Sequence, residues 1–147
     1  MLFRSIGGVF NTVLPLIPRF EARRDGQIAI MSSLAGLRGL PSVPTYAASK
    51  NAVRAWGDAL RPRLAPSGIR VSVICPGFVE SRITADNRFH MPFMMTAEAA
   101  ALATIRGLER NRGRIYFPWQ LAIPTRIVAA LPVVLGNRLL MRVPFKE

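Results

Sequence analysis

The apolar residues of this chain follow two patterns, one typical of amphipathic helices and the other of short buried strands. Apolar side chains recur every three or four positions over residues 4–24 and 43–64, which predicts two helices, the first kinked at Pro15. A third helix is expected over residues 96–110, with Thr96 as its N-cap. The buried face of the second helix is predicted to hold Val53, Trp56, Leu60 and Leu64.

Three short apolar runs alternate with these helices, at residues 27–32, 69–75 and 114–117. The second run is rich in β-branched residues, as is typical of a buried strand in a parallel sheet. Strands that alternate with helices predict an α/β fold, in which right-handed crossovers build a parallel sheet. Ligands of such sheets bind outside the carboxyl ends of the strands.

Composition excludes some classes of protein. The 147 residues have room for one domain with a sizeable core, and a hydrophobic content of 50% excludes a disordered tail. The net charge of +12, from 20 basic and 8 acidic residues, is a property of many nucleic-acid-binding proteins. The arginines are scattered, however, and the clusters at residues 23–24 and 110–114 contain no recognition motif. We therefore expect no nucleic-acid partner.

Cysteine and histidine are too scarce for a disulfide or a metal site. Cys75 is the only cysteine and His90 the only histidine, so neither an intrachain disulfide nor a metal cluster is available. A lone thiol within an apolar strand is consistent with a reducing compartment, and we expect a cytoplasmic location. Pro15 and Pro18 interrupt the N-terminal segment, which is predicted to be a buried helix rather than a signal peptide.

Tyr46 and Lys50 form the most informative pair in the sequence. They are one helical turn apart on the same face, where an ammonium favours the phenolate and lowers the tyrosine pKa from its ordinary value of about 10. A phenol tuned in this way can exchange a proton with an alcohol or a ketone near neutral pH. Ser33 follows the preceding apolar run and is placed to hydrogen-bond the same substrate oxygen.

The segments around these residues resemble the short-chain dehydrogenase/reductase (SDR) family. Residues 26–33 resemble its fifth strand, which ends in serine, and residues 39–41 resemble the loop that follows. The pair Tyr46 and Lys50 matches its Tyr-x-x-x-Lys motif, and residues 74–79 resemble its later Pro-Gly segment. The resemblance implies a Rossmann-like, doubly wound parallel sheet. It also implies hydride transfer between NAD(P) and an alcohol or carbonyl substrate.

The resemblance also implies roles for individual residues. It assigns catalysis to Ser33, Tyr46 and Lys50. It assigns cofactor binding to Tyr46, Lys50, Pro76, Gly77, Val79 and Ser81. Lys50 is expected to hold the nicotinamide ribose, and the backbone near Pro76 and Gly77 is expected to contact the nicotinamide. Ser81 keeps a hydroxyl group where the family often has threonine.

Several features of the family are missing from this sequence. No glycine-rich turn follows a strand, because the only adjacent glycine pair, Gly7-Gly8, lies within a helical pattern. The acidic residue expected on the adenosine ribose is also absent, and Ser5 stands where the family commonly has an asparagine for proton relay. The resemblance covers only the second half of the family's domain. We therefore expect a truncated SDR domain over residues 1–118, with weak or no dinucleotide affinity of its own.

The segment from residue 82 to residue 95 aligns with the family's variable substrate loop. Its apolar residues favour a hydrophobic substrate and a mobile lid, with plain core packing as an equal alternative for each of them. These residues are Phe89, Met91, Phe93, Met94 and Met95. His90 is interpreted as a loop residue, since Tyr46 already fills the acid–base role.

Residues 119–147 form an apolar and basic C-terminal extension. The apolar stretch over residues 127–136 is far shorter than the ~20 residues needed to span a bilayer. Two interpretations remain open for this extension. It is either a cap or interface over the substrate site, or a helix pair that lies on an anionic membrane surface.

Three classes of function follow from these observations. The first is an SDR oxidoreductase, the second a non-catalytic remnant that serves in binding or interaction, and the third a peripheral membrane protein. A homo-oligomer is also expected, because SDR helices equivalent to residues 4–24 and 43–64 commonly pack against their symmetry mates. Apolar residues occupy more than half of the first helix's circumference, which is too much for one buried face. They are Val9, Phe10, Val13, Leu14 and Ile17.

Overall fold

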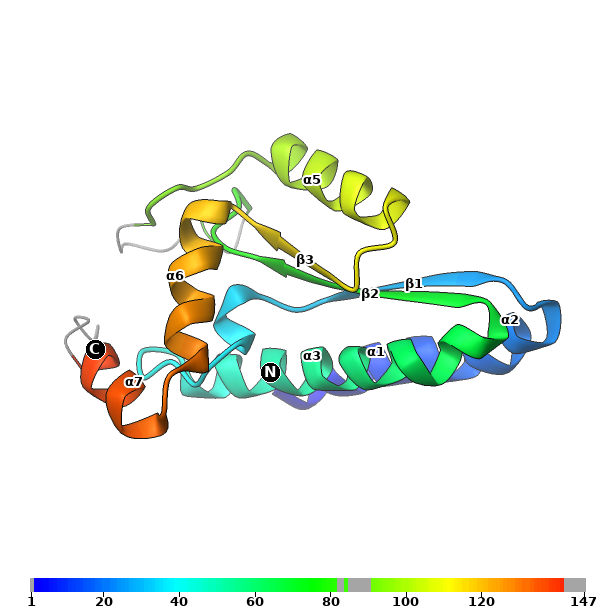
Figure 1. The fold of residues 1–147 in the computed structure, drawn as a ribbon, viewed down its shortest axis with the longest axis horizontal. Helices are drawn as coiled ribbons and strands as arrows, with labels where there is room; N and C mark the ends of the chain where they lie inside the picture. The colour runs from blue at the N-terminus through cyan, green and yellow to red at the C-terminus, as the bar shows by residue number, and fades with distance from the viewer. Residues whose placement is uncertain (1, 82–83, 85–90, 142–147) are drawn as a thin grey trace.

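A parallel sheet with helices on both faces forms the centre of the molecule, as seen in a computed structural model that describes residues 2–81, 84 and 91–141 (Figure 1). Its three strands are β1 (Gly26–Met31), β2 (Ile69–Pro76) and β3 (Arg114–Phe117), in the order β1-β2-β3. Both strand pairs are parallel, with Gly26 opposite Ile69 and Val73 opposite Arg114. The predicted α/β class and all three predicted strands are confirmed, with the ends of the strands shifted by one residue at most.

The helices also lie where the hydrophobic pattern predicts them. The first helical segment divides into α1 (Leu2–Val13) and α2 (Ile17–Arg23), separated by a 3₁₀ turn, η1 (Leu14–Leu16). Pro15 lies in that turn, where its missing N–H cannot continue the helix. The second predicted helix is α3 (Pro44–Leu64), and a short 3₁₀ turn, η2 (Leu34–Gly36), precedes it.

The third predicted helix is α5 (Ala97–Glu109), and its N-cap is Thr96 as expected. The Thr96 hydroxyl accepts a hydrogen bond from the backbone N–H of Ala99 at 3.2 Å, which satisfies one free donor of the first turn. Two further helices follow β3, namely α6 (Trp119–Ala130) and α7 (Val133–Leu140). Figure 1 shows α6 standing across one end of the sheet, with α7 beyond it.

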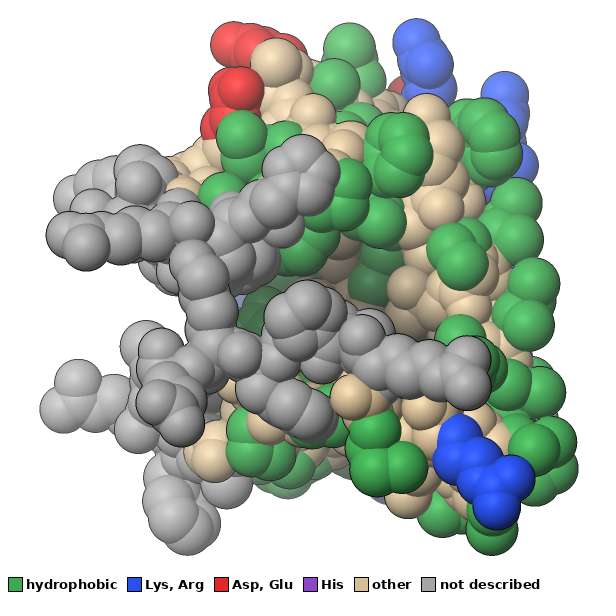
Figure 2. Space-filling model, turned by 90° about the vertical axis from the view of Figure 1, so that its left-hand side faces the viewer, with side chains coloured by type: hydrophobic (Ala, Val, Ile, Leu, Met, Phe, Trp, Pro, Cys, Tyr) green, Lys and Arg blue, Asp and Glu red, His purple; other side chains and the backbone are tan. Residues whose placement is uncertain are grey.

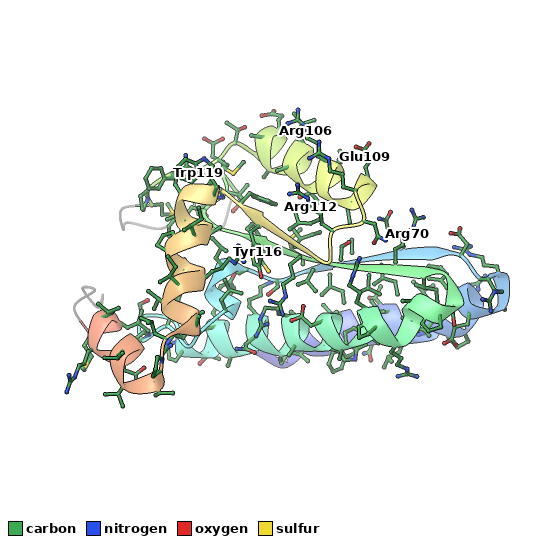
Figure 3. The ribbon with its side chains drawn as sticks, viewed as in Figure 1. Arg70, Arg106, Glu109, Arg112, Tyr116 and Trp119 are labelled. Carbon is green, nitrogen blue, oxygen red and sulfur yellow. The ribbon has the colours of Figure 1, made fainter. Side chains whose placement is uncertain are left out.

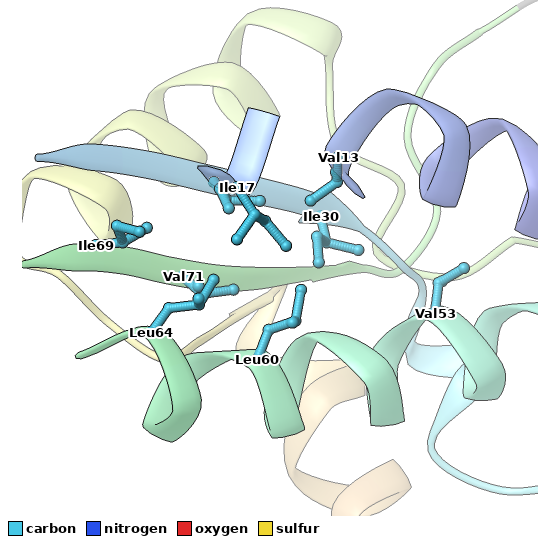
Figure 4. Close-up of a cluster of buried hydrophobic side chains, with 9 residues drawn as sticks. Val13, Ile17, Ile30, Val53, Leu60, Leu64, Ile69 and Val71 are labelled. Carbon is cyan, nitrogen blue, oxygen red and sulfur yellow. The ribbon is translucent and has the colours of Figure 1, made fainter. Parts of the chain in front are cut away.

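One face of the sheet packs on α1 and α3 and forms the largest hydrophobic core (Figure 4). Val53, Leu60 and Leu64 are buried as predicted, and Trp56 is half-buried against the ring of Phe10, with 4.5 Å between the ring centroids. Each fully buried aliphatic side chain contributes about 1.5–3 kcal/mol relative to exposure. The other core members are Val13, Ile17, Ile28, Ile30, Ile69 and Val71.

The opposite face of the sheet packs on α5, which covers β2 and β3 but leaves β1 uncovered. Ile74, Ala100, Ile115 and Phe117 form this smaller buried cluster between β2, β3 and α5. Side chains of β1 alternate between buried and exposed, and Met31 is 49% exposed. No strand of the described residues pairs with the outer edge of β1, so both this edge and one face of β1 are open.

The apolar residues predicted around the first helix are partly buried within this chain. Val13 and Ile17 are buried, Val9 and Phe10 are half-buried, and Leu14 is 50% exposed. Leu14 therefore remains available for a contact between chains, and the homo-oligomer stays a prediction. None of the described helices is both long enough and apolar enough to cross a membrane.

Candidate active site

The carboxyl end of β1 and the start of α3 are joined by two hydrogen bonds made by Lys50. Its Nζ donates to the carbonyl oxygen of Met31 at 3.3 Å. Its own carbonyl oxygen accepts from the hydroxyl of Ser32, a buried residue, at 2.8 Å. These two contacts hold the first turns of α3, which carry Tyr46 and Lys50, against the strand that ends just before Ser33.

Ser33 links the ends of two strands. It is buried, and its hydroxyl oxygen caps η2 by accepting from the N–H of Ala35 at 3.1 Å. The same hydroxyl donates to the carbonyl oxygen of Pro76, the last residue of β2, at 3.4 Å. The predicted site residues Ser33 and Pro76 are therefore in direct contact at the edge of the sheet where ligands of parallel sheets bind.

Tyr46 presents its ring to the outside at the start of α3. The side chain is 46% exposed, and the Lys50 ammonium lies 5.7 Å from the centroid of its ring. The buried hydroxyl of Ser49 donates to the carbonyl oxygen of Tyr46 at 2.7 Å, which stiffens this turn. Burial lowers the pKa of Lys50 from its usual value, because partial removal from water disfavours the charged amine. An accessible phenol beside this amine can exchange protons with a bound oxygen group.

Gly77 has no room for a side chain, because Leu121 of α6 and Pro118, the residue before α6, approach its backbone closely. A Cβ atom at this position would lie 2.9 Å from Leu121 Cδ1 and 3.1 Å from Pro118 Cδ. The Gly77 N–H donates to the carbonyl oxygen of Phe117 at 2.7 Å, which ties the ends of β2 and β3 together. The packing of Leu121 on this site was not predicted, since no local sequence pattern connects α6 with the end of β2.

Val79 and Ser81 follow Gly77 in a segment that is braced from two sides. Val79 forms a parallel bridge with Met95. Thr84 donates from its hydroxyl to the carbonyl oxygen of Val79 at 2.9 Å and accepts from the N–H of Ser81 at 2.8 Å. The Ser81 and Thr84 hydroxyls lie 3.2 Å apart, so Ser81 acts in this local turn, together with a threonine that sequence analysis missed.

A hollow of about 380 Å³ lies at the carboxyl ends of β1 and β2, beside α5. Two predicted cofactor residues, Pro76 and Val79, line it. Thr104 supplies the one side-chain hydroxyl of its lining, and that group donates to the carbonyl oxygen of Ala100 in its own helix at 2.9 Å. The hollow is therefore suited to a flat group of low polarity. The remaining lining residues, not predicted as site residues, are Met31, Ala100, Ala101, Ile105 and Phe117.

A network of charged side chains lies next to the site, on the side of the sheet that faces α3. Asp58 of α3 accepts two hydrogen bonds from Arg114, both at 2.8 Å, and one from Arg54 at 2.9 Å. Arg54 also donates to the carbonyl oxygen of Gly36 in η2 at 3.0 Å. Tyr116, next to α6 in Figure 3, lies 3.4 Å from a guanidinium nitrogen of Arg114. These contacts hold η2, α3 and β3 in one arrangement.

Cys75 lies in β2 immediately before Pro76 and takes no part in the site. Its side chain is fully buried, and burial raises the pKa of its thiol to about 11. The thiol is therefore protonated at neutral pH and is a poor nucleophile.

Comparison with known proteins decides the family. The family model for short chain dehydrogenase matches residues 1–91. The chain belongs to the short-chain dehydrogenase family. An uncharacterized oxidoreductase of Myxococcus xanthus is 40% identical over 128 residues, which cover 87% of this chain and 51% of the relative. The ketoacyl reductase HetN of a Nostoc species is 33% identical over 119 residues, which cover 73% of this chain and 42% of that protein.

Solved structures of the family share the fold. A short-chain dehydrogenase from Burkholderia cenocepacia, in complex with NADP, superposes with a TM-score of 0.80 at 24% identity. The match covers 97% of this chain and 58% of that one. The chain spans about half the length of the curated relatives it matches.

The short-chain dehydrogenase residues predicted from the sequence meet at one end of the sheet. Ser33 contacts Pro76, Lys50 contacts Met31, and Gly77 contacts Phe117, so three separate segments converge there. Other predicted positions lie outside the described residues. These are Phe89 and His90 of the substrate loop and the side chain of Ser5.

Proposed function

We propose that this chain forms the catalytic half of an NAD(P)-dependent oxidoreductase that acts on a hydrophobic alcohol or carbonyl compound. The observation that carries this proposal is the convergence of Ser33, Pro76 and Lys50 at one end of the sheet, through the contacts to Pro76 and Met31. Tyr46 lies one turn from Lys50 at the same end and is open to a substrate. Family membership alone, over about half the length of the relatives, would not indicate which groups act.

Each side chain has a distinct role in the proposed reaction. When a carbonyl compound is reduced, the Tyr46 phenol donates its proton to the carbonyl oxygen, and in the reverse direction the phenolate takes the proton of the alcohol. The Ser33 hydroxyl hydrogen-bonds the same oxygen and orients it. Lys50 stabilises the phenolate through its positive charge. A bound nicotinamide supplies or accepts the hydride at the substrate carbon.

The residues present fit the nicotinamide end of the cofactor. The hollow beside Pro76 and Val79 is large enough for a flat ring, and its lining has little polarity. Lys50 lies at the adjacent end of α3, where an ammonium can donate to ribose hydroxyls. The sequence has no glycine-rich turn after a strand, so we propose that the dinucleotide phosphates need such a turn in addition to these residues.

The substrate is proposed to be hydrophobic because the surfaces next to the site are apolar. Phe93 and Met94, which belong to the substrate loop, are 56% and 45% exposed, and Leu121 of α6 packs beside Gly77. One of the relatives is named a ketoacyl reductase, which indicates a carbonyl substrate for that protein. We propose that residues 1–118 carry the site and that residues 119–147 cap it.

The test is an assay of NADH or NADPH oxidation with ketones of increasing alkyl length. It uses a polypeptide that contains both these residues and a glycine-rich nucleotide-binding turn. We expect kcat/KM to rise with each added methylene group, by about threefold to fourfold for complete burial at about 0.8 kcal/mol each. Turnover that is insensitive to chain length would contradict the hydrophobic substrate. Absence of turnover with every ketone and both cofactors would favour a non-catalytic interaction module.

A second candidate function is peripheral contact with a membrane through α6 and α7. Trp119, Ile127 and Val133 are 68%, 59% and 70% exposed, and residues 110–141 contain no acidic side chain. Figure 2 shows the end of the molecule next to α6 and α7, where green apolar side chains are common and charged ones are few. Arg126 and Arg138, both exposed, are suited to anionic headgroups. Flotation with anionic vesicles but not with neutral ones would support this role, and no flotation with either would exclude it.

A further inference from the structure

Arg38 makes an unusual set of contacts that the proposed reaction does not use. It lies between η2 and α3, and its guanidinium reaches the junction between α6 and α7. Nη1 donates to the carbonyl oxygens of Val128 at 2.8 Å and Leu131 at 3.0 Å. Nη2 donates to the carbonyl oxygen of Val133 at 3.1 Å and to Asn137 Oδ1 at 3.4 Å. One side chain therefore serves four acceptors in α6, in α7 and in the link between them.

Two of these acceptors, the carbonyl groups of Val128 and Leu131, lie at the C-terminal end of α6. The last four carbonyl groups of an α-helix have no donor within the helix, and they carry the negative end of its dipole. α6 ends at Ala130, and the chain continues through Leu131 into Pro132, which has no N–H to offer. The positively charged Arg38 thus caps α6 from a distant part of the chain and holds the start of α7 with the same group.

Gly136 shows how closely α7 is seated on this arginine. A Cβ atom at Gly136 would overlap the guanidinium carbon and both terminal nitrogens of Arg38. Of the residues in α7, all of which the structure describes, Gly136 is the one that is buried. α7 therefore docks by placing its glycine against the guanidinium, and its other side chains remain wholly or partly exposed.

The contact matters to the site because α6 spans the distance between Arg38 and Gly77. Near its start, Leu121 packs against Gly77, and the buried Ala122 belongs to the same cluster as Leu34, the residue after Ser33. At its far end, the carbonyl groups bind Arg38. Figure 1 shows α6 standing across this end of the molecule, between β3 and the start of α3.

We propose that Arg38 is a positioning residue that fastens α6 and α7 to the segment between Ser33 and Tyr46, so that α6 forms a fixed wall of the substrate site. The statement about the substrate wall rests on the proposed function, whereas the fastening itself does not. Arg38 touches no reacting atom in this scheme. Its role is to keep α6 at one distance from the catalytic side chains.

The first experiment measures amide hydrogen exchange in the 147-residue chain, which requires no activity. In Arg38→Ala we expect amides of residues 119–141 to exchange at least about tenfold faster, while amides of β1 and β2 are unchanged. Arg38→Lys should be intermediate, because a single ammonium cannot span all four acceptors. Arg106→Ala is the matched control, since Arg106 lies on α5, away from α6 and α7 (Figure 3).

Gly136→Ala tests the same contact from the other side. Its methyl group displaces the guanidinium, so it should loosen residues 119–141 even if Arg38→Ala fails to fold. Unchanged exchange over these residues in both variants would overturn the proposal. Faster exchange throughout the sheet in Gly136→Ala would also overturn it, because the arginine would then support the whole fold rather than α6 and α7.

The second experiment measures kinetics in the polypeptide that also contains a glycine-rich turn. In Arg38→Ala we expect the KM for a bulky ketone to rise by about tenfold, with kcat and the KM for the dinucleotide changed by less than about threefold. A fall in kcat with unchanged KM would overturn the role of α6 as a substrate wall. If the wild-type protein has no turnover, the proposed function fails, and the exchange experiment still decides the role of Arg38.

Discussion

Lys50 Nζ lies 3.3 Å from the carbonyl oxygen of Met31 and donates a hydrogen bond to it. This contact turns the lysine toward the end of β1, one helical turn from Tyr46. A surface pair of tyrosine and lysine with the same spacing would have no such anchor. The hydrogen bond therefore places Lys50 at the end of the sheet where the proposed site lies.

Tyr46→Phe should abolish nearly all turnover without loss of stability. The phenol is 46% exposed, so removing its hydroxyl costs little in folding, whereas loss of the acid–base group is expected to lower kcat by about 100-fold or more. The measurement is NAD(P)H oxidation in the polypeptide that also contains a glycine-rich turn, together with the midpoint of thermal unfolding. Tyr116→Phe, at the only other tyrosine, is the control and should keep its activity. An active Tyr46→Phe enzyme would refute the assignment.

The stability of the chain should depend on pH through Lys50. Burial lowers the pKa of Lys50 in the folded state, so the unfolded chain holds the proton more tightly. The resulting penalty on folding is present at neutral pH. It disappears as pH rises through the window between the lowered pKa and the usual value of about 10.4. Wild type should therefore gain stability relative to Lys50→Met over that window.

Urea unfolding of both proteins at about pH 7 and about pH 10 measures this difference. The control is Arg110→Met, which removes an exposed positive charge and should show no such change. If the free energies of unfolding of wild type and Lys50→Met differ by the same amount at the two pH values, burial of Lys50 has no consequence for folding.

Gly77→Ala should destabilise the fold by about 1–3 kcal/mol, because the new methyl group has no room. Leu121 Cδ1 would lie 2.9 Å from it. In a double-mutant cycle, Leu121→Ala should relieve part of this cost, since it removes the atom in contact. Gly39→Ala is the control, because nothing lies within 4 Å of a Cβ atom at Gly39. Equal costs for the two glycine substitutions, measured by chemical denaturation, would show that α6 does not press on Gly77.

A homo-oligomer should form through α1 and α3, with Leu14 in the contact. The side chain is 50% exposed in η1, between α1 and α2. Light scattering at tens of micromolar protein should give the mass of a dimer or a larger assembly for wild type. It should give the mass of a monomer for Leu14→Glu, since a charge in an apolar interface is costly. Thr12→Glu, an exposed position on α1, is the control. A monomeric wild type would exclude the interface.

Residues 1–147 by themselves should bind NADH and NADPH weakly or not at all. The lining of the hollow beside Pro76 has no charged side chain to bind phosphates, and the sequence has no glycine-rich turn after a strand to bind them either. Calorimetry should give no dissociation constant below about 100 μM, or about −5.5 kcal/mol. Micromolar binding would show that the phosphates find donors elsewhere in this chain.

The parts of the structure that the sequence predicted are those decided by neighbouring residues. Thr96 caps α5, Pro15 separates α1 from α2, and Tyr46 lies one turn from Lys50, because each depends on backbone geometry within a turn or two. The buried face of α3 was predicted for the same reason, since its apolar spacing matches the helical period. The strands were short and apolar, and their order followed from the alternation with helices.

The tertiary structure decided which distant residues meet. Arg38 binds the end of α6, and Leu121 closes over Gly77. No spacing in the sequence encodes these pairs, because they depend on how whole segments pack after they form. The same holds for the hollow beside Pro76, whose walls come from three strands and from α5. The sequence by itself determined the strands, the helices up to α5 and the proposed roles of Ser33, Tyr46 and Lys50. Only packing decided that α6 stands beside them, since a helix with several apolar faces can dock in more than one place.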